Sequence, residues 1–199
     1  NLDQRNNFKP NADEILSILK KKKIKLVIFN NPGNPTGVKY DYNEIISVIN
    51  YCQENEIFCL FDEVYHNTVF DGKKETILEK LDNLSSVAIL RSFSKQYFMT
   101  GFRVGYLIGD PKFIEKIKLA NETINSCLPP FVQIAAAHAL EQNYELKYSK
   151  SWEIIRGRRD IIYEGLTDYC NLDCVKPNSS FYIFPKLPNK YKGNSDKFA

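Results

Sequence analysis

Apolar residues in this chain cluster into short runs that are separated by longer amphipathic segments. Residues 24–29, 57–61 and 87–90 are rich in β-branched and aromatic side chains, a composition typical of buried strands. Between the first two runs, the apolar residues of segment 45–52 recur on one broad helical face. The order strand, helix, strand, helix, strand predicts an α/β protein with a mainly parallel sheet and helices on both faces.

Capping signals mark where several helices begin. Asn11 and Asp41 each precede a glutamate by three residues, as in a capping box, and Asp110 precedes a proline that suits the first helical turn. We therefore expect a helix after each of them. A helix is less clearly indicated between residues 73 and 84, where the second βαβ unit requires one. A further short strand is expected at residues 106–108.

Two more helices are predicted in the second half of the chain. The first is alanine-rich and covers residues 131–140, and we interpret His138 within it as a packed core histidine. The second runs over residues 144–169. Gly157 and Gly165 weaken its pattern and predict a kink or a break, because glycine is a poor helix former.

The last part of the chain predicts the start of a second domain. Residues 172–175 and 181–184 have the composition of two strands. The chain begins at Asn1 rather than at a methionine, and it closes without an evident terminal signal. We therefore expect it to be a piece of a longer polypeptide.

Chemically useful side chains follow each expected strand at its carboxyl end. They are Asn34 after the first strand, Asp62 and Tyr65 after the second, and Ser92, Ser94 and Lys95 after the third, with Arg103 shortly beyond. In open parallel sheets, ligands bind outside the carboxyl ends of the strands. The spacing of these groups fits one βα repeat between successive strands, so we expect them at the same edge of the sheet.

Each of these groups also has a purely structural interpretation. The asparagine could belong only to a turn, the aspartate only to a helix cap, the tyrosine only to the core and the lysine only to the surface. Taken together, those interpretations require three coincidences at one edge of the sheet.

Several ligand classes find little support in the sequence. It contains no G-x-G-x-x-G for a dinucleotide, no G-x-x-x-x-G-K-[ST] for a nucleoside triphosphate and no Ser-His-Asp arrangement for hydrolysis. A ring cofactor with an aldehyde and a phosphate would use every group at the predicted edge. The lysine would bind its aldehyde, the aspartate its ring nitrogen, the asparagine and tyrosine its phenolic oxygen, and serine with arginine its phosphate.

These residues stand in motifs that together resemble those of the class I/II aminotransferases, pyridoxal-phosphate enzymes of fold type I. The motifs are N-P-x-N-P-T-G around Asn34, D-x-x-Y from Asp62 to Tyr65, S-F-S-K ending at Lys95 and G-x-R-x-G-Y around Arg103. The resemblance covers nearly the whole chain, and the combination of motifs is specific.

The resemblance implies pyridoxal 5'-phosphate as the cofactor and Lys95, Asp62 and Tyr65 as catalytic residues. Lys95 would form the Schiff base and later move the substrate proton, while Asp62 would keep the pyridine nitrogen protonated. Asn34 and Tyr65 would bind the ring oxygen. The implied cofactor-binding set is Asn34, Asp62, Tyr65, Ser92, Ser94, Lys95 and Arg103, of which Ser92, Ser94 and Arg103 would bind the phosphate.

The resemblance also implies transamination between an amino acid and a 2-oxo acid by a cytoplasmic homodimer. A C–S β-lyase on the same fold would use the same groups and stays an alternative, as does a catalytically incomplete fragment. Residues 1–142 would form the second half of a three-layer, cofactor-binding large domain. Residues 143–199 would form a linking long helix and an incomplete small α+β domain.

Two parts of the family pattern have no counterpart in this sequence. One is the upstream segment with its glycine-rich, phosphate-binding turn and its ring-stacking aromatic residue. The other is the downstream arginine that binds the substrate carboxylate, because Arg156, Arg158 and Arg159 lie in the expected long helix and do not match it.

Composition narrows the picture further. The net charge is only +3, and the basic run at residues 20–25 closes a predicted helix, where cations suit the helix dipole, so nucleic-acid binding is not favoured. The five cysteines show no metal-ligand or redox spacing, so we expect no metal site. Their odd number, without a secretory signal, favours a reducing compartment. No apolar run has the length of a membrane span, so no membrane partner is expected.

Overall fold

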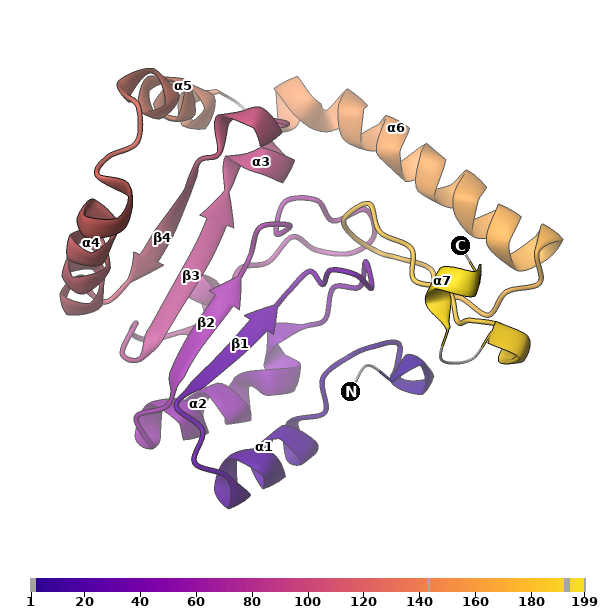
Figure 1. Ribbon diagram of the computed structural model, residues 1–199, viewed down its shortest axis with the longest axis horizontal. Coiled ribbons are helices and arrows are strands. Elements are labelled where there is room, and N and C mark those ends of the chain that lie inside the picture. The colour runs from indigo at the N-terminus through magenta and orange to yellow at the C-terminus, as the bar shows by residue number, and fades with distance from the viewer. Residues whose placement is uncertain (1–2, 143, 192–193, 199) are drawn as a thin grey trace.

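A mixed four-stranded sheet forms the centre of the structure (Figure 1). The computed structural model describes residues 3–142, 144–191 and 194–198. The strands are β1 (Leu26–Asn30), β2 (Phe58–Asp62), β3 (Val87–Ser92) and β4 (Gly105–Gly109), arranged in that order. β1, β2 and β3 run parallel, whereas β4 is antiparallel to β3. The strands expected around residues 24–29, 57–61, 87–90 and 106–108 and the mainly parallel sheet are therefore confirmed.

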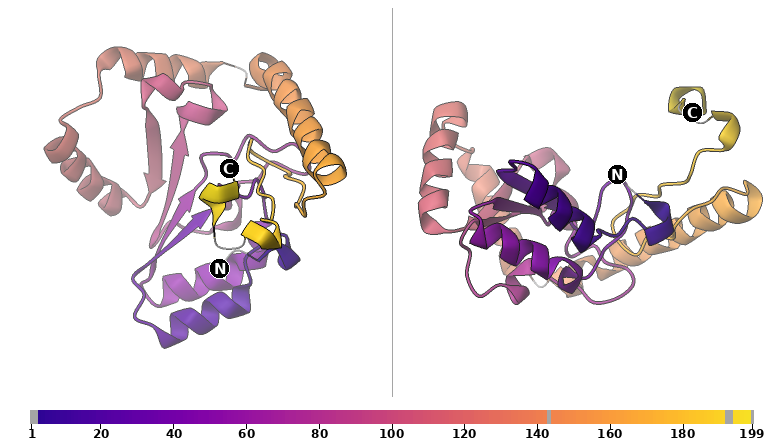
Figure 2. Two further views of the ribbon diagram at one scale, coloured as in Figure 1. Left: turned by 45° about the vertical axis from the view of Figure 1, so that its right-hand side comes forward. Right: turned by 90° about the horizontal axis from the view of Figure 1, so that it is seen from below.

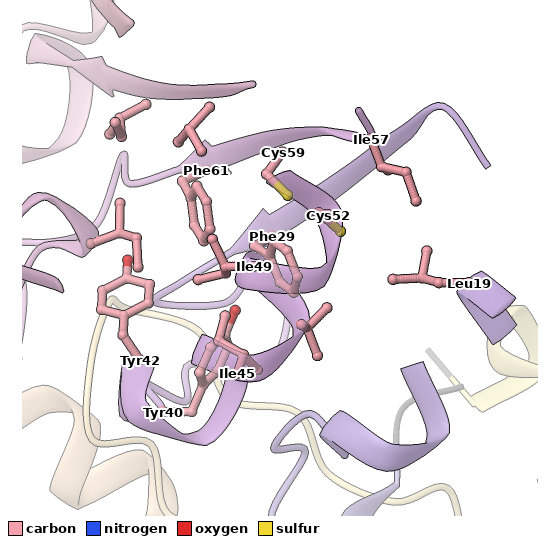
Figure 3. Packing of buried hydrophobic residues seen from close by; sticks show 14 residues of the cluster. Leu19, Phe29, Tyr40, Tyr42, Ile45, Ile49, Cys52, Ile57, Cys59 and Phe61 are labelled. Atoms are coloured by element: carbon pink, nitrogen blue, oxygen red, sulfur yellow. The ribbon is translucent and has the colours of Figure 1, made fainter. Parts of the chain in front are cut away.

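One face of the sheet carries the main core. Helices α1 (Ala12–Lys21) and α2 (Ile46–Glu54) belong to this side, and their apolar residues pack with alternate residues of the strands (Figure 3). Phe29 and Phe61 stack there with ring centroids 5.0 Å apart. Because side chains alternate along a strand, this face takes every second strand residue and leaves the others on the opposite face.

The predicted caps start these helices. Asn11 Oδ1 accepts the Glu14 backbone N–H at 3.1 Å, at the beginning of α1. Asp41 accepts the Asn43 backbone N–H at 2.8 Å and opens a single 3-10 turn (Tyr42–Ile45), which leads directly into α2.

The opposite face is only partly covered within the described part of the chain. Helix α4 (Pro111–Asn125) packs its Phe113 against Phe58 of β2, with ring centroids 4.4 Å apart. Leu26 and Ile28 lie on the same face as Phe58 and are 49% and 61% exposed. The structure thus shows an α/β fold in which helices cover one sheet face well and the other only in part. The sequence had predicted helices on both faces, in three layers.

A second apolar cluster forms at the β4 side of the sheet. Helix α5 (Pro130–Glu141) contributes Val132, Ala136 and Ala139, which meet the short helix α3 (Phe93–Gln96) that follows β3. His138 lies on the other side of α5 and is exposed, so its interpretation as a core histidine was wrong. The small alanine positions, rather than the histidine, face the cluster.

Helix α6 (Tyr144–Glu164) extends away from the sheet (Figures 1 and 2). Gly157 does not interrupt it, but a π-helical turn (Gly165–Tyr169) replaces the regular helix at the second predicted glycine. The domain boundary expected at residue 143 lies outside the described residues. A last short helix, α7 (Ser195–Phe198), ends the described chain.

Two further predictions were wrong. Residues 73–84 contain only a 3-10 turn (Ile77–Lys80), because this polar stretch offers a single fully buried anchor, Ile77. Residues 172–175 and 181–184 form no strands; an isolated bridge joins Cys174 to Pro185 instead. Pro177, which has no backbone N–H, and a left-handed Ser180 separate the two runs.

The backbone of residues 177–182, named the docking segment below, bonds to loops of the sheet. The side chain of Asn178 also bonds to the Lys39 backbone: its Oδ1 accepts the Lys39 N–H at 2.6 Å and its Nδ2 donates to the Lys39 carbonyl at 3.1 Å. The Ser179 N–H donates to the Gly37 carbonyl at 3.0 Å, and the Ser180 N–H donates to the Thr68 carbonyl at 2.9 Å. These bonds fasten a segment from the end of the chain to the loops that follow β1 and β2.

Arg159 adds an ionic anchor for the docking segment. Its buried guanidinium on α6 pairs with Asp71 and donates to the Pro177 carbonyl at 2.8 Å. Arg156 also pairs with Asp71, at 3.0 Å. Two of the three arginines of the long helix thus have structural partners.

None of the helices in the described ranges combines the length and apolar composition that a membrane span requires.

Substitution of Gly37 by alanine should loosen the docking segment. Gly37 has φ +69°, and an added Cβ would collide with the Tyr182 carbonyl and lie 2.7 Å from Pro177 Cβ. The left-handed backbone and the overlap together should cost roughly 2–4 kcal/mol of unfolding free energy in denaturant titrations. Gly101→Ala is the matched control, since nothing lies within 4 Å of its added Cβ. Equal stability of the two variants would contradict this close approach.

Candidate active site

The three parallel strands end at one edge of the sheet, and the loops that leave them carry the predicted residues. The register pairs Asn30 with Asp62 and Asp62 with Leu90, so the strand ends are adjacent. Asn34 is exposed in the loop after β1, where its backbone N–H donates to Asn30 Oδ1 at 2.6 Å. The chain thus brings the three strand ends together, as expected from their spacing.

Asp62 is half-buried at the end of β2. Burial raises the pKa of its carboxyl above the ordinary value, while the Val64 backbone N–H and the Asn30 side chain act in the opposite direction. The Val64 N–H lies 3.2 Å from Asp62 Oδ1. Such a carboxylate, partly removed from water, is suited to pair with a cationic nitrogen of a ligand.

Tyr65 and Asn34 converge on a single phenolic oxygen, the hydroxyl of Tyr182. Tyr65 Oη lies 2.7 Å from Tyr182 Oη, and Asn34 Nδ2 donates to the same oxygen at 3.3 Å. Tyr65 is only 4% exposed. Burial raises its pKa above the ordinary value, and Tyr182 and the Asp62 charge add to the effect, so Tyr65 keeps its proton and can donate it in a hydrogen bond.

Lys95 stands in α3, directly after the end of β3. Its ammonium lies 5.3 Å from the ring centroid of Phe181, the neighbour of Tyr182 in the docking segment. Within the described residues, Lys95 Nζ has no hydrogen bond and no ion pair. The amine is thus covered by an aromatic ring but is not neutralised by an acid.

Ser92, Ser94 and Arg103 form the third part of the site. Ser92 Oγ caps α3 by accepting the Ser94 N–H at 3.0 Å. Arg103 Nη1 lies 3.5 Å from Ser94 Oγ and donates to the Thr100 carbonyl at 2.9 Å. An exposed guanidinium beside the Ser94 hydroxyl has the donor chemistry of a phosphate site.

The structure therefore assembles the predicted residues into neighbouring groups. Asn34 and Tyr65 meet through Tyr182, Lys95 lies against the adjacent Phe181, and Ser94 meets Arg103. Asp62 bonds to none of the other predicted residues, although its charge acts on Tyr65.

Sequence reasoning missed the aromatic pair of the docking segment. Phe181 and Tyr182 belong to the run that was expected to be a strand, and their rings lie edge-on to Tyr65 at 5.7 and 5.6 Å. Two adjacent aromatic residues after a polar turn were the available signal. Their partners Tyr65 and Asn34 are more than a hundred residues away in the chain, so no local pattern connects them.

Sequence reasoning also missed a buried ionic network directly behind the site. Glu63 is fully buried, and Arg91 donates to its Oε2 at 2.8 and 3.2 Å. Thr76 donates to the same carboxylate at 2.8 Å, the Ile77 N–H at 2.7 Å and Tyr42 Oη at 2.8 Å. This network joins the ends of β2 and β3 to the turn between them.

Pyridoxal phosphate fits this set of groups. Asn34 and Tyr65 hydrogen-bond the Tyr182 hydroxyl, a phenolic oxygen of the kind that the cofactor ring carries. Lys95 could supply an amine for the aldehyde, Asp62 a carboxylate for the ring nitrogen, and Arg103 with its serine neighbours donors for the phosphate. No group of three or more potential ligands for a metal ion is found among the described residues.

Known proteins match this chain over nearly all of its length. The family model described as aminotransferase class I and II matches residues 1–199. An aspartate aminotransferase from Sulfurisphaera tokodaii is 35% identical over 178 residues, which make up 89% of this chain and 44% of that protein.

Solved structures give the same result. The aspartate aminotransferase of Thermotoga maritima superposes with a TM-score of 0.86 at 28% identity, over 98% of this chain and 50% of that one. The aromatic aminotransferase of Pyrococcus horikoshii gives the same TM-score and identity, over 98% of this chain and 52% of that one. The chain thus spans about half the length of the relatives it matches.

Substitution of Glu63 by glutamine should destabilise the fold far more than the loss of one hydrogen bond would. Glutamine keeps the shape but leaves the Arg91 charge, 14% exposed, without its counter-ion. Breaking such a buried pair costs roughly 3–5 kcal/mol of unfolding free energy, measurable by denaturant titration. Glu79→Gln, on the surface of the adjacent turn, is the control and should change little. A similar stability for both variants would rule out the buried pair as a structural requirement.

His66 should make the fold acid-sensitive. Burial lowers its pKa from 6.5 to about 4, and the Arg91 charge acts in the same direction. Below pH 6.5 His66 binds a proton in the unfolded chain but stays neutral in the folded protein. The free energy of unfolding therefore falls as the pH drops from 6.5 towards 4. Between pH 7 and pH 5 the loss due to His66 should be about 2 kcal/mol.

His66→Asn should remove that part of the loss, since asparagine can still donate to the Glu63 carbonyl that His66 Nδ1 meets at 3.1 Å. Unfolding free energies at the two pH values measure the effect. The exposed His138→Asn variant should retain the full acid loss. If His66→Asn also retains it, a neutral buried His66 is not its source.

Proposed function

This chain belongs to the class I and II aminotransferase family, and from this premise we propose that the protein containing it is a pyridoxal 5'-phosphate-dependent aminotransferase. The reaction moves an amino group between an amino acid and a 2-oxo acid. The observation that carries the proposal is the convergence of Asn34 and Tyr65 on one phenolic oxygen, beside the exposed edge that also bears Lys95 and Asp62. When bound, the cofactor supplies an electron sink for the charge that develops at the substrate Cα.

Lys95 has two roles in this proposal. Its amine would hold the cofactor through the aldehyde group, and as a free amine Lys95 Nζ would carry the proton from and to the substrate Cα. A covering ring and the lack of an acidic partner suit both roles, because the amine is not held in an ion pair.

The remaining residues hold and polarise the ring. Asp62 would stabilise a proton on the ring nitrogen, and its partial removal from water would strengthen that ion pair. Tyr65 and Asn34 would donate to the phenolic oxygen of the ring, and Arg103 with Ser92 and Ser94 would bind the phosphate.

The whole protein is expected to be larger than the described fold. In our proposal, residues 1–142 belong to a cofactor-binding large domain with helices on both sheet faces, and residues 143–199 begin a small domain. Another part of the polypeptide, or a second copy in a homodimer, then supplies the rest of the site. The five cysteines are all free thiols, which supports a reducing, cytoplasmic setting.

The amino-acid substrate is not assigned to one side-chain class. Relatives of similar identity are described by different names, aspartate aminotransferase and aromatic aminotransferase among them.

Lys95→Ala in the full-length gene product should abolish covalent cofactor binding. Wild-type protein mixed with pyridoxal phosphate should develop a visible absorbance band, and borohydride should fix the cofactor on the peptide that contains Lys95. The variant should show neither, whereas Lys116→Ala, which removes an exposed lysine on α4, should behave like the wild type. An unchanged adduct in Lys95→Ala would refute the assignment.

The products decide the reaction type. Transfer of the amino group to an added 2-oxo acid supports transamination. Release of ammonia and pyruvate from a cysteine conjugate without an acceptor would instead identify a C–S β-lyase.

A further inference from the structure

The Tyr182 hydroxyl occupies the position that the proposed function assigns to the ring oxygen of the cofactor. Asn34 Nδ2 donates to it at 3.3 Å and Tyr65 Oη lies 2.7 Å from it. Asn34 is the donor in its bond, whereas either hydroxyl can donate between Tyr65 and Tyr182; with Tyr65 as the donor, the two side chains serve one acceptor atom at that point. The Tyr182 hydroxyl and a ligand oxygen therefore exclude each other from this fork of Asn34 and Tyr65.

The neighbouring residue covers the second group that a cofactor must reach. The Phe181 ring lies 5.3 Å from Lys95 Nζ and is packed against Tyr182, with ring centroids 4.9 Å apart. One dipeptide thus occupies both the oxygen-binding fork and the approach to the amine. Both contacts come from the docking segment, whose backbone is fastened to the loops that follow β1 and β2.

The backbone of residues 181–183 is bonded less tightly than the residues on either side of it. Backbone hydrogen bonds fix Ser179 and Ser180 before them and Lys186 after them. Within the described chain, no backbone hydrogen bond holds Phe181, Tyr182 or Ile183. Phe181 is 44% exposed, so part of its ring already faces solvent.

We propose that Tyr182 is a positioning residue that fills the Asn34–Tyr65 fork until pyridoxal phosphate displaces it, so that the two compete for the same hydrogen bonds. The inference rests on the proposed function. The hydroxyl keeps both donors satisfied and oriented in the absence of ligand, and its displacement lowers the affinity for the cofactor. Phe181 leaves the Lys95 amine in the same movement.

The test measures cofactor affinity in the full-length gene product freed of pyridoxal phosphate. Tyr182→Phe retains the ring but cannot occupy the fork, so pyridoxal phosphate should bind about 3- to 10-fold more tightly by calorimetry, the factor that one net hydrogen bond represents. Tyr51→Phe, a half-buried tyrosine of α2, is the control and should leave the affinity unchanged.

A cofactor analogue separates competition for hydrogen bonds from a simple effect of side-chain bulk. 3-Deoxypyridoxal phosphate lacks the ring oxygen and has nothing to place in the fork. Its affinity should be the same for the wild type and Tyr182→Phe. An equal gain for both ligands, or weaker binding of pyridoxal phosphate by Tyr182→Phe, would overturn the proposal.

A second measurement keeps the tyrosine hydroxyl at position 182. 3-Fluorotyrosine at position 182 should change its fluorine resonance towards that of a solvent-exposed tyrosine when pyridoxal phosphate is added. An unchanged resonance at saturating cofactor would overturn the displacement. Failure of the wild type to bind pyridoxal phosphate would refute the proposed function itself, whereas normal binding with no effect of Tyr182→Phe refutes only the competition.

Discussion

The buried carboxylate of Glu63 is the constraint on which the arrangement of the site depends. A charge with no exposure to water is tolerated only if every oxygen lone pair has a partner, and here Arg91, Thr76, Tyr42 and a backbone N–H supply them. The partners come from β3, from the turn before it and from the entry to α2. These elements must therefore take fixed positions around the end of β2. Asp62, one residue earlier, lies on the other face of that strand end, so the same backbone that fixes the internal carboxylate also fixes the one at the candidate site.

Much of the fold was predictable because its signals are local. The buried strands have continuous apolar runs, and the caps at Asn11, Asp41 and Asp110 lie within a few residues of the groups they satisfy. The failures have different causes. The stretch at residues 73–84 offers a single buried anchor, and Pro177 with the left-handed Ser180 separates the two C-terminal runs. The exposed position of His138 depends instead on which side of α5 packs in the second cluster.

The candidate site divides in the same way. Its strand-end residues were predictable from spacing, since a parallel sheet brings equivalent ends to one edge. Phe181 and Tyr182 were not predictable, because only the tertiary attachment of Asn178 and Ser179 to the loop after β1 brings them to Tyr65 and Lys95. An alternating apolar pattern indicates which side chains are buried, but it does not identify the segment to which the backbone forms hydrogen bonds. Here the partners are loops, and the expected pair of strands did not form.

The fork of Asn34 and Tyr65 contains a buried hydroxyl that needs a hydrogen-bond partner, and Tyr182 provides one. The Tyr65 hydroxyl is almost inaccessible to water, so an empty fork would leave a polar group unsatisfied at a cost comparable to that of a hydrogen bond. A side chain that supplies an equivalent oxygen removes this cost and keeps the Tyr65 and Asn34 donors in the geometry that a phenolic ligand requires. Preorganisation of this kind reduces the entropy lost on binding, while the contact to be displaced adds an opposing cost. The net cofactor affinity depends on which of these two effects is larger. In the ranges that the structure describes, the displaced tyrosine belongs to a segment whose backbone is bonded at Ser179, Ser180 and Lys186 but not at the aromatic residues between them.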